Sequence, residues 1–269
     1  MRLTNFITIE GETKMTKTAF VLEGKLGAPV LLVANSLGAN YSMWDPQIEE
    51  WKKNFQVLRY NYRGHGGTPS VGNFATSQDL ADDVNELLES LNIKEIYWVG
   101  LSLGAMLGLY FAAHYPQKVK ALASACFRPY QSPESFAMWE TRIKTVVENG
   151  VGAIVAGTAD RWLTEGFRNA NPEIDQALRV MIGANEADGY MACGHAVKDY
   201  DLRPYVGKIS CPVLLIGGKF DGGAPASDIA ELRSVIPNSE YAELPGAHIA
   251  NLECATDFTQ IVNKFMLSH

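Results

Sequence analysis

Short runs of apolar residues recur along the chain, separated by longer stretches in which apolar and polar residues alternate at helical spacing. Most of these runs are almost continuously apolar, a pattern typical of strands buried on both faces of a parallel sheet. They cover residues 28–35, 55–61, 96–100, 119–126 and 212–217. A further strand is predicted over residues 240–244.

Amphipathic helices are predicted between the strands. Residues 77–91 place leucine and valine at intervals of three and four, with acidic residues on the opposite face. Residues 103–114 are apolar and rich in alanine and glycine, which suits a helix buried against a sheet, and residues 255–266 form a closing amphipathic helix. Alternation of strands and helices over this length predicts an α/β fold with a mostly parallel central sheet flanked by helices.

The alternation stops between about Phe127 and Lys208, where no strand is predicted. Helices are expected there over residues 134–149, 151–159, 173–184 and 186–197. An all-helical insert in an α/β sheet predicts a cap over the active site; the alternative is a run of ordinary packing helices. We therefore divide the chain into a core of residues 1–127 and 209–269 and a helical cap of residues 128–208.

Composition and charge exclude several classes of partner and binding site. The 269 residues carry a net charge of −7 without a basic run, which argues against a nucleic-acid partner. No stretch reaches the 18 or so apolar residues of a membrane helix, so we expect a cytoplasmic enzyme with a small-molecule partner and no membrane partner. The four cysteines are widely spread, which argues against a zinc site or a disulfide framework and predicts mostly buried thiols. Oligomeric state is left open.

The segment Gly100-Leu101-Ser102-Leu103-Gly104 matches the pattern G-x-S-x-G between a predicted strand and a predicted helix. In that context the pattern predicts a nucleophile elbow, a sharp turn that exposes the Ser102 hydroxyl at a helix N-terminus. The alternative is a serine in an ordinary glycine-rich turn.

A serine hydroxyl is a weak nucleophile at neutral pH and needs a base. Of the five histidines, His248 follows the predicted strand 240–244 in a loop before the last helix, which is where such a base is expected. The others fit worse, since His65 lies in a turn, His114 ends a helix, His195 lies in the cap and His269 is terminal.

The base needs an orienting acid, and Asp221 follows the buried strand 212–217. The order Ser102, Asp221, His248 is that of α/β hydrolases, although a lone aspartate could instead cap a helix. The oxyanion needs two backbone donors. The amide of Leu103, directly after the nucleophile, is one candidate; the amide of Leu37, after the first predicted strand, is the other, with Ser36 as the alternative.

These residues resemble the 3-oxoadipate enol-lactonases, a family of α/β hydrolases. The matching segments are 33–47 (VANSLGANYSMWDPQ), 58–66 (LRYNYRGHG), 100–108 (GLSLGAMLG), 161–162 (RW), 202–204 (LRP) and 247–253 (AHIANLE). The Asn-Ser-Leu-Gly run replaces the His-Gly pair of most α/β hydrolases. The pair Gly222-Gly223 and residues 1–17 depart from the family pattern.

The resemblance implies opening of a five-membered enol-lactone with a carboxymethyl group to 3-oxoadipate, in aromatic catabolism, with no metal or cofactor. The substrate carboxylate would need a cation or several donors. Arg161 with the matching Trp162 is the first candidate, and Trp139 is a candidate aromatic wall of the pocket. Arg128, Arg142 and His195 lie in or near the cap as further candidates for the carboxylate.

Other functions stay open at this point. A carbon–carbon bond hydrolase acting on ring-cleavage products can share this triad and cap, and so can a general carboxylesterase, lactonase or perhydrolase. A ligand receptor could keep the triad and turn over very slowly. A haloalkane dehalogenase is disfavoured, because it requires an aspartate where Ser102 stands.

Overall fold

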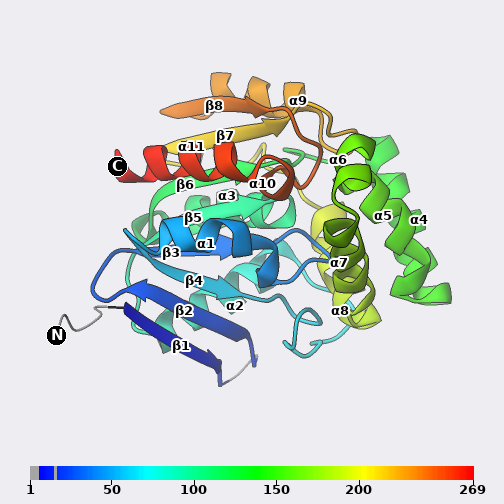
Figure 1. The fold of residues 1–269 in the computed structure, drawn as a ribbon, viewed down its shortest axis with the longest axis horizontal. Helices are drawn as coiled ribbons and strands as arrows, with labels where there is room; N and C mark the ends of the chain where they lie inside the picture. Colours follow the sequence, from blue (N-terminus) through cyan, green and yellow to red (C-terminus); the bar gives the residue numbers. More distant parts are fainter. Residues whose placement is uncertain (1–5, 15–16) are drawn as a thin grey trace.

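The computed structural model describes residues 6–14 and 17–269. Its centre is one eight-stranded sheet in the order β1-β2-β4-β3-β5-β6-β7-β8 (Figure 1). The strands are β1 (Phe6–Glu12), β2 (Ala19–Lys25), β3 (Val30–Ala34), β4 (Gln56–Tyr60), β5 (Ile96–Leu101), β6 (Val119–Ala125), β7 (Val213–Gly218) and β8 (Ser239–Leu244). The mostly parallel sheet predicted from the sequence is confirmed, because neighbouring strands are parallel throughout the part of the sheet ordered β4-β3-β5-β6-β7-β8.

The two N-terminal strands, β1 and β2, are not predicted by the sequence analysis. They pair antiparallel with one another, and β2 pairs antiparallel with β4. Seven residues of β1 lie at the sheet edge and most are exposed, so this strand lacks the buried apolar run that marks the others. Antiparallel pairing with β2, rather than an apolar pattern of its own, makes it a strand.

Helices cover both faces of the sheet. In Figure 1, α1 (Asp45–Trp51) and α11 (Ala255–Leu267) lie on the near face, and α2 (Ser77–Ser90) and α3 (Leu103–His114) lie behind. The helix α2 begins at Thr76 with a capping box that includes Asp79. The helix α3 is apolar nearly all round because it packs between the sheet and α2. The remaining core helices are α9 (Ala226–Glu231), α10 (Ala250–Glu253), η1 (Tyr41–Trp44), η2 (Pro116–Lys118) and η5 (Leu232–Ser234).

The segment between β6 and β7 is helical, as predicted, and Figure 1 shows its helices gathered at one end of the sheet. They are α4 (Pro133–Asn149), η3 (Val151–Ile154), α5 (Val155–Trp162), α6 (Glu165–Ala170), α7 (Pro172–Gly183) and α8 (Ala187–Lys198), and the 3₁₀ helix η4 (Val206–Lys208) follows α8 in the chain before β7. The helix predicted over 151–159 is instead a 3₁₀ turn followed by α5, and α6 is not predicted. We call residues 128–208 the cap; its division from the core at these residues stays a prediction.

The topology brings several loops to one edge of the sheet. Because β3, β5, β6, β7 and β8 are parallel neighbours, their carboxyl ends all meet there. Ligands of open α/β sheets bind outside the carboxyl ends of the strands. The segments that carry the candidate residues are therefore assembled in space although they lie far apart in the sequence.

The cysteines match the expectation of unlinked thiols. Cys126, Cys193 and Cys211 are buried, Cys254 is half-buried, and all four are free. Within residues 6–14 and 17–269, no helix combines the length and apolar character needed to cross a membrane.

Candidate active site

Ser102 lies in a strained turn between β5 and α3, with φ 57° and ψ −116°. Its amide donates to the carbonyl of Ala125 at 2.9 Å, and the Gly104 amide donates to the carbonyl of Asn35 at 3.0 Å. A Cβ atom on Gly100 would lie 2.1 Å from the Gly104 carbonyl oxygen, and one on Gly104 would lie 2.1 Å from that of Ala34. Both glycines are therefore required by close backbone approach, as expected for a nucleophile elbow.

Asp221 and His248 are joined directly. The Nδ1 atom of His248 lies 2.7 Å from Oδ2 of Asp221, while Oδ1 accepts from the amides of Gly223 at 2.8 Å and Ala224 at 2.9 Å. Burial by itself would raise the pKa of Asp221, but the neighbouring His248 and the two amides hold that pKa below its ordinary value. An ionised Asp221 accepts a hydrogen bond from Nδ1–H, and the unprotonated Nε2 is then free to act as a base.

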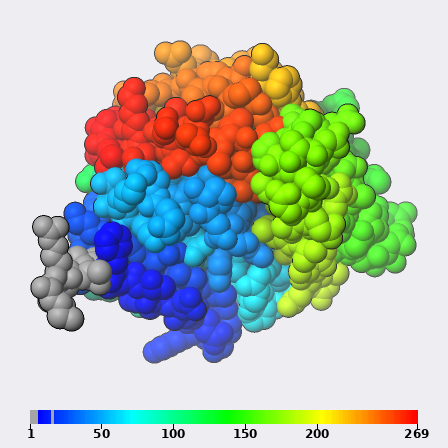
Figure 2. Space-filling view, viewed as in Figure 1, coloured from blue at the N-terminus to red at the C-terminus, as the bar shows by residue number. Residues whose placement is uncertain are grey.

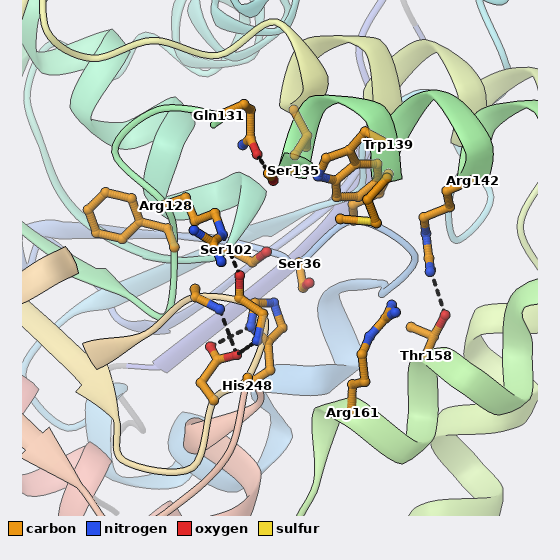
Figure 3. A pocket seen from close by; sticks show the side chains of 18 of the residues that line it. Ser36, Ser102, Arg128, Gln131, Ser135, Trp139, Arg142, Thr158, Arg161 and His248 are labelled. Carbon is orange, nitrogen blue, oxygen red and sulfur yellow. Dashed lines mark hydrogen bonds and ion pairs between the residues drawn. The ribbon is translucent and has the colours of Figure 1, made fainter. Parts of the chain in front are cut away.

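Ser102, Asp221 and His248 all line one cavity of about 360 Å³. Figure 3 shows Ser102 and His248 near its centre, at the carboxyl edge of the sheet. The alternative in which Asp221 serves only as a helix cap does not account for its contact with His248.

Within the described part of the chain, the amides of Leu37 and Leu103 donate no hydrogen bond. Leu103 begins α3, so its amide belongs to the positive end of that helix. Leu37 and the alternative donor Ser36 line the cavity. This arrangement leaves both predicted donors available to an oxyanion.

His65, which the sequence analysis places only in a turn, supports the Leu37 segment. Its Nε2 accepts from the Gly38 amide at 3.1 Å, and its Nδ1 lies 2.9 Å from the Arg63 carbonyl. Burial lowers the pKa of His65 to about 4, so the ring is neutral and carries its proton on Nδ1. A histidine 27 residues from Gly38 in sequence thus fixes the backbone beside a predicted oxyanion donor.

The cap supplies much of the opposite wall of the cavity. Its apolar surface includes Trp139 from α4 and Trp162 from α5, the two predicted tryptophans. Trp162 is buried, and its carbonyl accepts the Ile249 amide at 2.9 Å, so it also contacts the loop that carries His248. Further apolar lining comes from Leu37, Met106, Phe127 and Met138.

Two arginines of the cap face each other across one side of this cavity (Figure 3). Arg142 donates to the Tyr190 hydroxyl at 2.7 Å and to the Thr158 hydroxyl at 2.5 Å. Partial desolvation and the charge of Arg142 lower the pKa of Arg161. Among the described residues neither guanidinium is paired with a carboxylate. Two neighbouring cations without a carboxylate partner are chemically suited to an anion.

The other two candidates for an anion contact are disfavoured. Arg128 lines the cavity, but it donates to the Gly223 carbonyl at 2.6 Å and pairs with Asp228 at 3.3 Å. His195 does not line this cavity and packs against Phe74, with ring centroids 5.0 Å apart. The sequence could not show that Arg128 is paired, because its partner Asp228 lies 100 residues further along the chain.

The sequence comparisons agree with this geometry. A family model described as the alpha/beta hydrolase fold matches residues 29–255. The chain belongs to the α/β-hydrolase family. The fold class predicted from the sequence, including the helical insert, is thereby confirmed.

The hydrolase is similar to enol-lactonases in particular. It is 33% identical to 3-oxoadipate enol-lactonase 2 of Acinetobacter baylyi over 90% of both chains. The crystal structure of the enol-lactonase from Burkholderia xenovorans LB400 is 30% identical, with a TM-score of 0.92, and covers 96% of this chain and 100% of that one. A putative carbamate hydrolase, RutD of Agrobacterium fabrum, is 27% identical over 89% of this chain and 94% of its own. The resemblance to enol-lactonases is confirmed, and the protein is a hydrolase.

The described residues contain no group of three or more histidine, cysteine, aspartate or glutamate side chains arranged to hold a metal ion. Independence from metal and cofactor stays a prediction.

Proposed function

We propose that this hydrolase opens 3-oxoadipate enol-lactone to 3-oxoadipate, using Ser102 as nucleophile, His248 as base and Asp221 as the acid that orients it. The observation that supports an anionic substrate is that Arg142 and Arg161 line the same cavity as Ser102 and that, among the described residues, neither pairs with a carboxylate. A carboxymethyl group of the lactone meets these guanidinium groups, and the ring carbonyl is then presented to Ser102.

The reaction follows from these positions. The Ser102 oxygen attacks the ring carbonyl carbon while His248 Nε2 takes the hydroxyl proton, and Asp221 stabilises the imidazolium. The Leu37 and Leu103 amides donate to the oxyanion; losing one such donor typically costs about 10²–10³ in rate. Collapse breaks the ring carbon–oxygen bond, and the enol oxygen leaves with the proton from His248.

The second half releases the acid. The enol tautomerises to the ketone while its acyl carbon remains bound to Ser102. A water molecule gives its proton to His248 and attacks the acyl carbon, and the Ser102 oxygen leaves with that proton. The product is an open-chain ketone with two carboxylates.

The apolar part of the cavity supports a small, flat substrate. Trp139 is half-buried on α4, and Arg142 lies 5.6 Å from the centroid of its ring. This cation–π contact holds Arg142 beside the aromatic wall. The lactone ring lies against Trp139 and Trp162, and its carboxylate lies toward the arginines.

The test is hydrolysis of 3-oxoadipate enol-lactone by purified wild type and by Ser102→Ala, followed as loss of the lactone's ultraviolet absorbance. We expect wild type to turn over the lactone and Ser102→Ala to lose at least about 10⁴-fold in kcat. Turnover of p-nitrophenyl acetate without turnover of the lactone would support a general carboxylesterase and overturn the proposed substrate. A burst of product without sustained turnover on either compound would support a receptor.

A further inference from the structure

The loop that carries His248 is bonded on both sides of that residue. The Ala247 amide donates to Oε2 of Glu253 at 2.9 Å, and the Ile249 amide donates to the carbonyl of Trp162 at 2.9 Å. Ala247 and Ile249 are both buried. Two hydrogen bonds to the residues directly before and after His248 restrict how its backbone can move relative to Ser102.

Glu253 also reaches the cap. Its Oε2 accepts the Thr164 amide at 3.3 Å, and its Oε1 accepts the Thr164 hydroxyl. Thr164 caps the N-terminus of α6, and its hydroxyl oxygen accepts the Phe167 amide at 3.3 Å. In Figure 2 the cap residues around this position lie directly against the C-terminal segment that contains Glu253. One half-buried carboxylate therefore bonds the cap and the His248 loop at the same time.

The cap residues in these contacts are close in sequence to the anion site. Trp162, the residue after Arg161, accepts a hydrogen bond from the Ile249 amide through its carbonyl. Thr164, three residues after Arg161, donates to Glu253. A displacement of residues 161–164 would therefore change both the arginine that faces the substrate and the support of the base. The residues that face the substrate and those that support the His248 loop therefore lie within four consecutive positions of the cap.

From this geometry we propose that Glu253 is a positioning residue. It holds the His248 loop in its position relative to Ser102, and it makes that position depend on how the cap packs against the core. The inference rests on the proposed roles of Ser102 and His248 but not on the proposed lactone. Glu253 does not line the cavity, and the hydrogen bond from Ile249 to Trp162, beside Arg161, does not involve it. Its removal therefore acts on the rate of the chemical step more than on substrate binding.

The experiment compares Glu253→Leu, Glu253→Gln, Thr164→Val and Glu165→Gln with wild type. Glutamine retains one acceptor for the Ala247 amide, whereas leucine retains none. Thr164→Val removes the hydroxyl contact and leaves the Ala247 bond in place. Glu165 is an exposed carboxylate beside Thr164, so Glu165→Gln is the matched control for charge.

Four quantities are measured: kcat and KM on p-nitrophenyl acetate and on the lactone, the rate at which a fluorophosphonate probe labels Ser102, and the thermal midpoint. We expect Glu253→Leu to lower kcat and the labelling rate by about 10- to 100-fold with KM changed less than about twofold. Glu253→Gln recovers most of this loss, Thr164→Val loses about threefold to tenfold, and Glu165→Gln matches wild type.

Wild-type kcat and labelling in Glu253→Leu would overturn the inference. So would a loss that glutamine does not recover, or one expressed as a rise in KM. If Glu253→Leu does not fold, Glu253→Gln and Thr164→Val give the same comparison with smaller changes. Wild-type labelling of Ser102 without lactone turnover would overturn the proposed substrate alone, and the labelling rates would still decide the role of Glu253.

Discussion

The two walls of the cavity are built in different ways. On the sheet side, backbone atoms set the geometry, because Ser102 lies at φ 57° and the chain around Gly104 approaches β3 too closely for a side chain. On the cap side, the surface is made by the long side chains of Trp139, Arg142 and Arg161, which project from helices.

Because of this difference, the residues that determine the chemical reaction are not the ones that determine which substrate binds. A change on the sheet side displaces backbone that also forms the core, so few alternatives are compatible with the fold. A change on the cap side exchanges one side chain for another on an intact helix. We therefore expect the hydrolytic chemistry to depend on the sheet edge and the choice of substrate to depend on the cap.

The largest effect should come from Asp221→Asn on the sheet side. An asparagine amide facing Nδ1 favours the wrong tautomer of His248, so we expect kcat to fall by about 10⁴-fold while KM stays within about threefold. Steady-state kinetics on the best substrate measures this change. Asp228→Asn, which removes a carboxylate paired with Arg128, is the control and should lose less than about threefold. A loss of less than tenfold in Asp221→Asn would argue against its proposed role.

Gly104→Ala should test the backbone wall directly. The new methyl group would lie 2.1 Å from the Ala34 carbonyl oxygen, so we expect the free energy of unfolding to fall by about 3 kcal/mol. Gly222→Ala is the matched control, since a Cβ atom there meets no other atom within 4 Å and should change stability by less than about 0.5 kcal/mol. Urea unfolding of the two variants gives the comparison, and equal losses would contradict it.

His65 connects the two walls, because it bonds Gly38 on the sheet side and its ring stacks on Tyr190 of the cap, with centroids 6.4 Å apart. Its pKa is about 4 in the folded protein, below the value of about 6.5 expected when unfolded. Between these pH values the unfolded state binds the proton and the folded state does not. Stability should therefore fall as pH falls through this window, by about 3 kcal/mol in total.

The measurement is the free energy of unfolding of wild type and His65→Gln from pH 7 to pH 4. We expect His65→Gln to be less stable at pH 7, because glutamine does not reproduce both ring contacts, and to lose this part of the pH dependence. Identical pH dependence in the two proteins would show that His65 does not cause it.

The smallest effect should come from Arg161→Met on the cap side. Methionine keeps much of the side-chain volume without the charge, so we expect KM for the anionic lactone to rise by about 10-fold with kcat little changed. Turnover of neutral p-nitrophenyl acetate should stay within about twofold of wild type. Arg203→Met, which removes an exposed arginine paired with Asp201, is the control. Equal effects on the charged and neutral substrates would place the anion elsewhere.

The parts of the site that the sequence predicted are those with a local signature. The elbow around Ser102 was found because its glycines, strand and helix are contiguous in the chain. Asp221 and His248 were found because each follows a buried strand, and parallel strands end at the same edge. The structure joins these two by a 2.7 Å contact, while their catalytic roles remain proposals.

The parts that the sequence missed depend on partners far along the chain. Nothing near His65 indicates that its ring accepts from Gly38, and nothing near Glu253 indicates a contact with Thr164, 89 residues away. Arg128 was indistinguishable from Arg142 as a candidate until the structure paired it with Asp228. The strands β1 and β2 were missed for other reasons, since β1 is mostly exposed and β2 carries only a short apolar run, Ala19–Leu22.

The sequence alone determined the alternation of buried strands and amphipathic helices, the position of the helical insert and the serine elbow, because each depends on residues that are neighbours in the chain. Tertiary structure decided which arginines have no carboxylate partner, which histidine supports the Leu37 segment and which carboxylate bonds both the cap and the His248 loop. These outcomes depend on hydrogen bonds and ion pairs between distant residues, and such pairs form only when the sheet order brings their loops to one edge.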